Sequence, residues 1–172
     1  MKLAFVFPGQ GSQSVGMLDA LNAAFSSVAV TFAEASDVLG YDLWRLASQG
    51  PEARLNETQH TQPAMLAAGV AVWRVWQQQA GPAPVVLAGH SLGEYTALTC
   101  AEAITFADAV KLVADRGRYM QEAVPAGQGA MSAVLGLDPA RVREVCAAVA
   151  AETGEVVSPA NYNEPAQTVI AG

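Results

Sequence analysis

The chain has 172 residues, 52% of them hydrophobic, and carries a formal net charge of −7. This length and apolar content indicate an ordinary globular protein with a well-buried core, and exclude a disordered chain. The nine basic residues form no cluster, which argues against nucleic acid or an acidic membrane surface as the main partner. A small anionic ligand would therefore have to be bound by an individual arginine.

Cysteine use and the N-terminal residues give no sign of export, metal binding or membrane insertion. Cys100 and Cys146 lie far apart, with no Cys-x-x-Cys motif and no histidine at metal-ligand spacing, so both are expected to be thiols of the core. The apolar run at 3–7 is too short for a signal peptide, and the run at 65–76 is interrupted by Arg74 and too short to span a membrane. A cytoplasmic protein is expected.

Residues 2–7 are predicted to form a fully buried β-strand that ends at Pro8 and continues into the loop Gly9-Gln10-Gly11-Ser12-Gln13. A glycine-rich loop after a first strand invites comparison with the dinucleotide-binding motif Gly-x-Gly-x-x-Gly. Ser14 stands where the third glycine would be, which disfavours nucleotide binding. The two glycines suit a close backbone approach instead, which would let a loop amide face a neighbouring site.

The next part of the chain is predicted to be helical. Residues 17–40 carry apolar side chains at helical spacing, and Gly40 is expected to end this region. A short helix is expected at 42–48. A longer helix is predicted at 61–79, with Pro63 in its first turn. This helix is apolar on nearly every face, so it should be buried beside the sheet.

The most informative stretch is a short apolar run at 85–88 followed by Gly89-His90-Ser91-Leu92-Gly93. A buried strand that turns sharply into a helix through Gly-x-Ser-x-Gly is typical of a nucleophile elbow, where bulk two residues from the strained serine would collide. The turn would hold the Ser91 hydroxyl at the N-terminus of the next helix, whose unpaired amides can receive an oxyanion. Ser91 is therefore the candidate nucleophile. The alternative is a chance match in a chain with 15 glycines.

A second informative helix is predicted at 105–124, where Thr105 and Asp108 can form a capping box. At about 100° per residue, one face forms a narrow apolar stripe. The predicted stripe comprises Phe106, Ala109, Val113, Met120 and Val124. Arg116 lies at its border, so it must find an anion or extend its stem to the surface. An ion pair with Glu34, Asp37 or Glu94 is the alternative to a functional role.

The C-terminal part has a different pattern. A strand is predicted at 130–135, a helix at 139–151 opened by Asp138, and strands at 156–157 and 168–170. The turn between the last two strands is placed at Asn161-Tyr162-Asn163-Glu164-Pro165. This β-α-β-β order is the first part of a ferredoxin-like unit. The glycine-rich hinge at 125–129 divides the chain into expected domains at 1–126 and 127–172.

A serine nucleophile needs a base within hydrogen-bond reach, usually a histidine. The chain has two histidines. His90 adjoins Ser91, and a neighbour across a tight turn normally points away from the serine oxygen. His60 is interpreted as a surface or capping residue before the long helix, without an evident path to Ser91. The residues alone thus predict a nucleophile without a convincing base.

Five motifs in one order carry a resemblance to a known family. They are Phe7-Pro8-Gly9-Gln10-Gly11-Ser12-Gln13, Thr61-Gln62-Pro63-Ala64, Gly89-His90-Ser91-Leu92-Gly93-Glu94-Tyr95, Arg116-Gly117-Arg118-Tyr119-Met120 and Gly129-Ala130-Met131. From residue 3 onward the chain closely resembles the malonyl-CoA:acyl carrier protein transacylases of type II fatty acid synthesis. The same motifs occur in acyltransferase domains of polyketide synthases, but the start at Met1 and the run at 121–125 look like the stand-alone bacterial enzyme.

The resemblance implies an α/β fold: an α/β-hydrolase-like large subdomain with a nucleophile elbow and an inserted ferredoxin-like small subdomain, both incomplete in this chain. It implies that Ser91 takes a malonyl group from malonyl-CoA and passes it to the phosphopantetheine thiol of acyl carrier protein. The arginine matching Arg116 binds the malonyl carboxylate, and the amides matching Gln10 and Leu92 form the oxyanion hole. Leu92, the variable residue of the Gly-His-Ser-x-Gly motif, resembles the residue found in members that prefer malonyl to methylmalonyl. No cofactor and no metal are implied.

The general base of this family is a histidine well beyond the ferredoxin-like unit, so these residues are expected to be the N-terminal part of a longer enzyme. Two other functions stay open. One is a serine esterase on the same elbow, with water as the acyl acceptor. The other is a non-catalytic remnant that binds coenzyme A or carrier protein.

Overall fold

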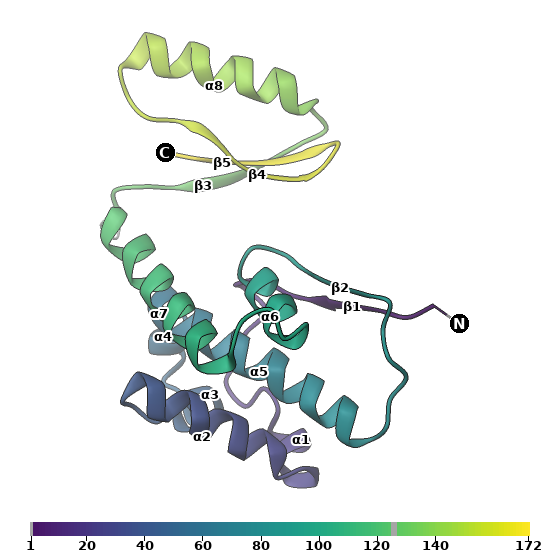
Figure 1. Ribbon diagram of the computed structural model, residues 1–172. Coiled ribbons are helices and arrows are strands. Elements are labelled where there is room, and N and C mark those ends of the chain that lie inside the picture. The colour runs from purple at the N-terminus through teal and green to yellow at the C-terminus, as the bar shows by residue number, and fades with distance from the viewer. Residues whose placement is uncertain (1, 125–126) are drawn as a thin grey trace. The chain divides into compact units, whose positions relative to one another are not determined.

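The computed structural model describes residues 2–124 and 127–172. Two compact units form the chain, Met1–Ala123 and Val124–Gly172. The expected domain boundary after residue 126 and the first half of the predicted hinge, Pro125 and Ala126, lie outside the described residues. The fold is mixed α/β, with a parallel sheet in the first unit and a separate antiparallel sheet in the second (Figure 1). In the described part of the chain, no helix has the length and apolar character needed to cross a membrane.

The first unit combines two strands with seven helices in the described residues. In chain order they are β1 (Ala4–Phe7), α1 (Asp19–Ala24), α2 (Ser27–Leu39), α3 (Leu43–Gln49), α4 (Glu52–Leu55), α5 (Thr58–Gln78), β2 (Val86–Gly89), α6 (Leu92–Cys100) and α7 (Phe106–Ala123). Gly40 ends α2 in the left-handed region at φ 74°, as expected. Both cysteines are free and buried, and burial raises the pKa of the Cys100 thiol to about 12.

The two strands pair in parallel, with Phe7 opposite Gly89. The prediction of a fully buried strand at 2–7 is wrong, because Val6 is 74% exposed, and the strand predicted as buried at 85–88 is only partly so, because Val86 is 53% exposed. Successive side chains point to opposite faces of a strand. Phe5 packs edge-on against Trp73 and Trp76 of α5, with ring centroids 5.2 Å apart in both pairs, whereas Val6 points to the other face. Helix α5 therefore covers one face of this sheet.

Helix α5 is the centre of the core and packs against α2, α6 and α7. Its burial on nearly every face confirms the prediction, but it begins at Thr58, so Pro63 lies in the second turn rather than the first. Proline there costs one backbone hydrogen bond. The extra turn carries its own support, because the amides of His60 and Thr61 both donate to the carbonyl of Glu57 at 2.8 Å. His60 is thus a helical residue, which corrects its predicted place before the helix.

The Thr105 cap predicted for α7 is present, although Asp108 reaches back to the Thr105 hydroxyl rather than to the Thr105 amide. The Thr105 hydroxyl donates to Asp108 at 2.7 Å and accepts from the Asp108 amide at 3.1 Å. The predicted apolar stripe is only partly correct, because Met120 is 49% exposed while Gly117 is buried. Helix α5 crosses α7 at Gly117, where an added Cβ would lie 2.7 Å from the Thr58 carbonyl oxygen. Met120 falls within the same arc of α7 as Ala109 and Val113, but it lies beyond this crossing, near the C-terminal end of the helix.

The second unit contains β3 (Met131–Leu135), α8 (Pro139–Thr153), β4 (Ser158–Glu164) and β5 (Gln167–Ala171), which confirms the β-α-β-β order. The strands form an antiparallel sheet in the order β3-β5-β4. Asp138 caps α8 by accepting from the Ala140 amide at 2.7 Å. The strand predicted at 156–157 and the turn predicted at 161–165 are wrong, because β4 covers most of that turn. Most side chains of β4 are exposed, so hydrophobicity gave no strand signal.

Candidate active site

The Ser91 turn joins β2 to α6 in the sharp conformation expected from the sequence. Ser91 has φ 53° and ψ −107°, a backbone conformation that residues other than glycine rarely adopt and that costs about 1–3 kcal/mol. Both flanking glycines are sterically required. A Cβ on Gly89 would lie 1.9 Å from the carbonyl carbon of Gly93, and a Cβ on Gly93 would lie 2.2 Å from the carbonyl oxygen of Phe7. The turn therefore accepts no side chain at either position.

Arg116 reaches this turn from α7. Its Nη2 donates to the Ser91 hydroxyl oxygen at 2.9 Å, and its Nη1 donates to Oε1 of Gln62 at 2.7 Å. The guanidinium also lies 5.8 Å from the centre of the Tyr95 ring. Arg116 is half-buried at the border of the buried face, as the sequence predicted. The ion pair offered as its alternative with Glu34 is not formed, because Glu34 accepts two hydrogen bonds from Arg74.

Gln62 is the site residue that the sequence reasoning missed. It is fully buried in α5, where its Oε1 accepts from Arg116 and its Nε2 donates to the Met120 sulfur at 3.3 Å. A buried amide with both ends engaged has little rotational freedom, so it holds the guanidinium in one orientation. A lone amide within an otherwise apolar helical stretch was the signal that could have identified Gln62.

The loop after β1 lies directly beside the Ser91 turn. The His90 amide donates to the Phe7 carbonyl at 3.2 Å, and a Cβ on Gly9 would lie 2.9 Å from the His90 carbonyl oxygen. This is the close backbone approach expected for the loop glycines. Gln10 follows Gly9 on the exposed side of the loop, and its side chain donates to the Thr58 hydroxyl at 3.1 Å.

Leu92 lies on the other side of Ser91 as the first residue of α6, and its side chain is 1% exposed. The first amides of a helix have no acceptor within the helix and carry partial positive charge. The turn thus brings together a hydroxyl, a guanidinium and the N-terminus of a helix. Chemically, this set favours negative charge at and around the Ser91 oxygen.

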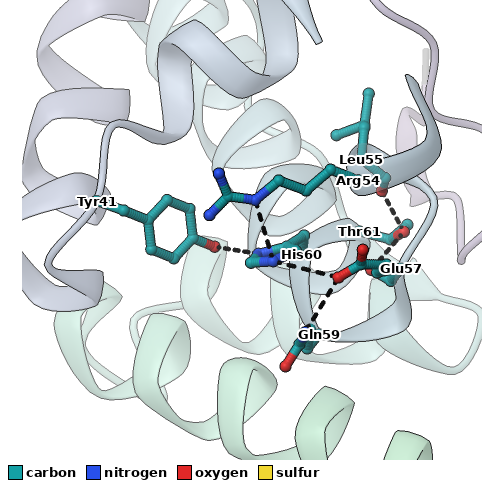
Figure 2. Close-up of polar contacts among 7 residues, drawn as sticks. All are labelled: Tyr41, Arg54, Leu55, Glu57, Gln59, His60 and Thr61. Atoms are coloured by element: carbon teal, nitrogen blue, oxygen red, sulfur yellow. Dashed lines mark hydrogen bonds and ion pairs between the residues drawn. The ribbon is translucent and has the colours of Figure 1, made fainter. Parts of the chain in front are cut away.

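Arg116 cannot accept the serine proton, because a guanidinium remains protonated in proteins. His60 is not a surface residue, since 13% of its side chain is exposed. Figure 2 shows its ring between Tyr41, Arg54 and Glu57: Nδ1 lies 3.1 Å from the Tyr41 hydroxyl, and Nε2 lies 3.5 Å from both Arg54 and Glu57. Burial and Arg54 lower the pKa of His60, while Glu57 partly opposes them.

Both ring nitrogens of His60 are therefore engaged by Tyr41, Arg54 and Glu57, and none of these residues contacts Ser91 in the hydrogen bonds described above. His90 Nδ1 lies near the loop after β1, 3.1 Å from the place that a Gly9 Cβ would take. That His90 is a poor candidate for the base of Ser91 stays a prediction. No group of three or more potential metal-binding side chains occurs among the described residues.

The chain matches the acyl transferase domain family over residues 4–172. It is 61% identical to the malonyl CoA-acyl carrier protein transacylase of Salmonella typhimurium over 99% of this chain and 55% of that protein. An acyl carrier protein S-malonyltransferase from Vibrio cholerae superposes with a TM-score of 0.92 at 60% identity, over 100% of this chain and 56% of that one. A malonyl-transacylase in complex with a type II polyketide synthase acyl-carrier protein superposes with a TM-score of 0.93 at 59% identity, over 100% of this chain and 55% of that one.

These likenesses extend over both sheets and over the Ser91 turn, and they agree with the chemistry of the site. The chain belongs to the acyl transferase domain family. It spans about half the length of the curated relatives that it matches.

Proposed function

We propose that this chain carries the nucleophile and the acyl-group anchor of an enzyme that transfers malonyl from malonyl-CoA to acyl carrier protein in fatty acid biosynthesis. The observation that carries the proposal is the contact between Ser91 and Arg116, with the guanidinium held by the buried Gln62. A nucleophile whose hydroxyl already touches a fixed cation suits an acyl group that ends in a carboxylate. The names of the relatives support the same substrate and acceptor.

In the first half-reaction, the Ser91 oxygen attacks the thioester carbonyl of malonyl-CoA while a general base takes its proton. The tetrahedral oxyanion is bound by the amides of Gln10 and Leu92, which flank Ser91 on the loop after β1 and on α6. Collapse of the intermediate expels the coenzyme A thiolate and leaves a malonyl ester on Ser91. The base gives its proton to that thiolate. It then takes the proton of the pantetheine thiol of acyl carrier protein as the sulfur attacks the ester, and returns it to the Ser91 oxygen as Ser91 is released.

Arg116 changes partner during this sequence. Without substrate it donates to Ser91 and Gln62. When malonyl is bound, its hydrogen bond to Ser91 is exchanged for a bidentate pair with the free carboxylate, while Gln62 keeps the guanidinium in place. Acetyl lacks that carboxylate, so Arg116 favours malonyl. On the family resemblance, leucine at the variable position of the Gly-His-Ser-x-Gly motif, Leu92, favours malonyl over methylmalonyl.

The general base belongs to the same proposal. The Ser91 hydroxyl accepts a hydrogen bond from Arg116, and Arg116 cannot accept a proton. A histidine outside the 172 residues is proposed to take this role, on the family resemblance. We also propose that residues 1–126 belong to a hydrolase-like unit and residues 127–172 to a ferredoxin-like unit. The proposed enzyme is cytoplasmic, and it needs no cofactor because malonyl-CoA is its substrate. An esterase would share Ser91 but would have no use for a cation fixed at it.

The test is the acyl-enzyme itself. The protein at its natural full length is mixed with malonyl-CoA, digested and analysed by mass spectrometry, and transfer to acyl carrier protein is followed in parallel. We expect one malonyl group on Ser91, and neither acylation nor transfer in Ser91→Ala. Hydrolysis without transfer would support the esterase. Absence of both acylation and turnover would support a non-catalytic binding role.

A further inference from the structure

The segment Asn56 to Thr58, which runs from the end of α4 to the first residue of α5, holds the loop that carries Gln10. Gln10 Nε2 donates to the Thr58 hydroxyl at 3.1 Å, and Gln13 Nε2 donates to Asn56 Oδ1 at 2.8 Å. Gln13 Oε1 in turn accepts from the Gly11 amide at 2.8 Å. The loop is therefore tied at both ends to one short segment far away in the sequence.

This segment is itself held by a buried hydroxyl, that of Thr61. The Thr61 hydroxyl donates to the Leu55 carbonyl at 2.6 Å and lies 3.1 Å from the Glu57 carbonyl, so it links the end of α4 to the start of α5 (Figure 2). Thr61 and Leu55 are both fully buried. The hydroxyl has one proton to donate and lies within reach of both carbonyls, so distorting this turn would leave a buried polar group unpaired. Asn56 and Thr58 are thus presented from a rigid support.

The same turn of α5 also contacts the helix that carries Arg116. Gln62, which accepts from Arg116, lies four residues after Thr58 and hence on the same helical face. Gly117, next to Arg116, approaches the Thr58 carbonyl so closely that a Cβ would lie 2.7 Å from it. One turn of one helix therefore fixes both the Gln10 loop and the Arg116 guanidinium.

We propose that Asn56 and Thr58 are positioning residues, which set the distance of the Gln10 loop from Ser91 and from Arg116. This inference rests on the proposed function, in which the Gln10 amide binds the oxyanion. Neither residue touches the reacting atoms. An oxyanion donor acts only within about 2.7–3.1 Å of the developing charge, and a misplacement of about 1 Å can cost about 100-fold in rate. Loss of one tether therefore lowers kcat more than it alters substrate binding.

The test removes one hydroxyl without changing shape. In the full-length protein, Thr58→Val is expected to lower kcat for malonyl transfer about tenfold, with KM for malonyl-CoA within about twofold of wild type. Thr58→Ser restores the hydroxyl and is expected to recover most of kcat. Asn56→Ala, which releases the other tether, should show the same split between kcat and KM. Thr153→Val on α8 is the control. It removes a threonine hydroxyl that donates to the Val149 carbonyl and accepts from the Glu155 amide, and it leaves kcat unchanged.

A double-mutant cycle separates positioning from general destabilisation. If Thr58 acts through the Gln10 side chain, Gln10→Ala and Thr58→Val cause similar losses, and the double variant is no slower than either one. Multiplied losses in the double variant would overturn the inference, as would full kcat in Thr58→Val. A parallel loss in Thr58→Ser, with a lowered Tm, would show a merely structural role and also overturn it. If the wild-type protein forms no malonyl-enzyme, the proposed function fails first and this inference fails with it.

Discussion

Replacing Arg116 by alanine should change which acyl group the protein prefers. The substitution removes the cation that donates to Ser91 and Gln62 and leaves the Ser91 turn intact, because that turn is set by Gly89 and Gly93 rather than by α7. In the proposed function, malonyl then loses the partner of its carboxylate. Acetyl has no carboxylate and loses nothing comparable.

The expected magnitude follows from the hydrogen bonds at stake. A hydrogen bond to a charged group contributes about 1.5–3 kcal/mol, so a bidentate pair contributes about 3–6 kcal/mol. At about 1.4 kcal/mol per factor of ten, kcat/KM for malonyl-CoA should fall about 10²- to 10⁴-fold. The lower end is expected. Arg116 is only half-buried, and it must give up its 2.9 Å hydrogen bond to Ser91 before it binds the carboxylate.

The assay compares kcat/KM for malonyl-CoA and acetyl-CoA with acyl carrier protein as acceptor, in the wild type, Arg116→Ala and Arg116→Lys. Lysine keeps the charge but loses the bidentate fork, so it should retain only part of the selectivity. Arg118→Ala is the matched control on the same helix, because Arg118 is exposed and pairs with Asp115 and Glu122. It should leave both substrates unaffected. Equal losses for malonyl and acetyl in Arg116→Ala would refute the carboxylate role.

Two further predictions concern stability. Gly93→Ala places a Cβ 2.2 Å from the Phe7 carbonyl oxygen and should lower the free energy of unfolding in urea by about 3 kcal/mol or more. The control Gly40→Ala lies in open space at φ 74° and should lower it by only about 1–2 kcal/mol. Similar losses of unfolding free energy in the two variants would disprove the close approach. Burial and Arg54 lower the pKa of His60, so the unfolded chain takes up the proton more readily. Its contribution to stability is complete above the unfolded pKa of about 6.5 and is lost as pH falls through the lowered folded value. His60→Gln should flatten that decline, and an unchanged profile would assign the decline to other groups.

Several features could be predicted from the sequence because their causes are local. The glycines of the Ser91 turn, the Thr105 capping box and the Asp138 cap each depend on atoms within a few residues of one another. Backbone sterics and side-chain caps act at that range, whatever the rest of the chain does. The border position of Arg116 also followed from helical geometry alone.

Other features were predicted wrongly because burial depends on neighbours that no local sequence pattern contains. The apolar residues of β1 predicted a fully buried strand and those of β2 a buried one, but α5 covers one face of the sheet, and Val6 and Val86 are exposed. Strand β4 went unrecognised because its pairing with β5, rather than its hydrophobicity, makes it a strand. His60 belongs in this group too, since Tyr41 and Arg54 decide its burial.

The sequence by itself determined the Ser91 turn, the helix that carries Arg116 and the resemblance to an acyl transferase. It left open whether Arg116 binds an acidic side chain or serves the site. The tertiary structure decided which side chains Arg116 contacts, because α5 and α7 cross at Gly117. This crossing brings Gln62 and Arg116 together across 54 residues of sequence, and Arg116 lies within hydrogen-bond distance of Ser91 across 25. Contacts over such separations depend on how helices pack, and packing is a property of the whole core rather than of any one segment.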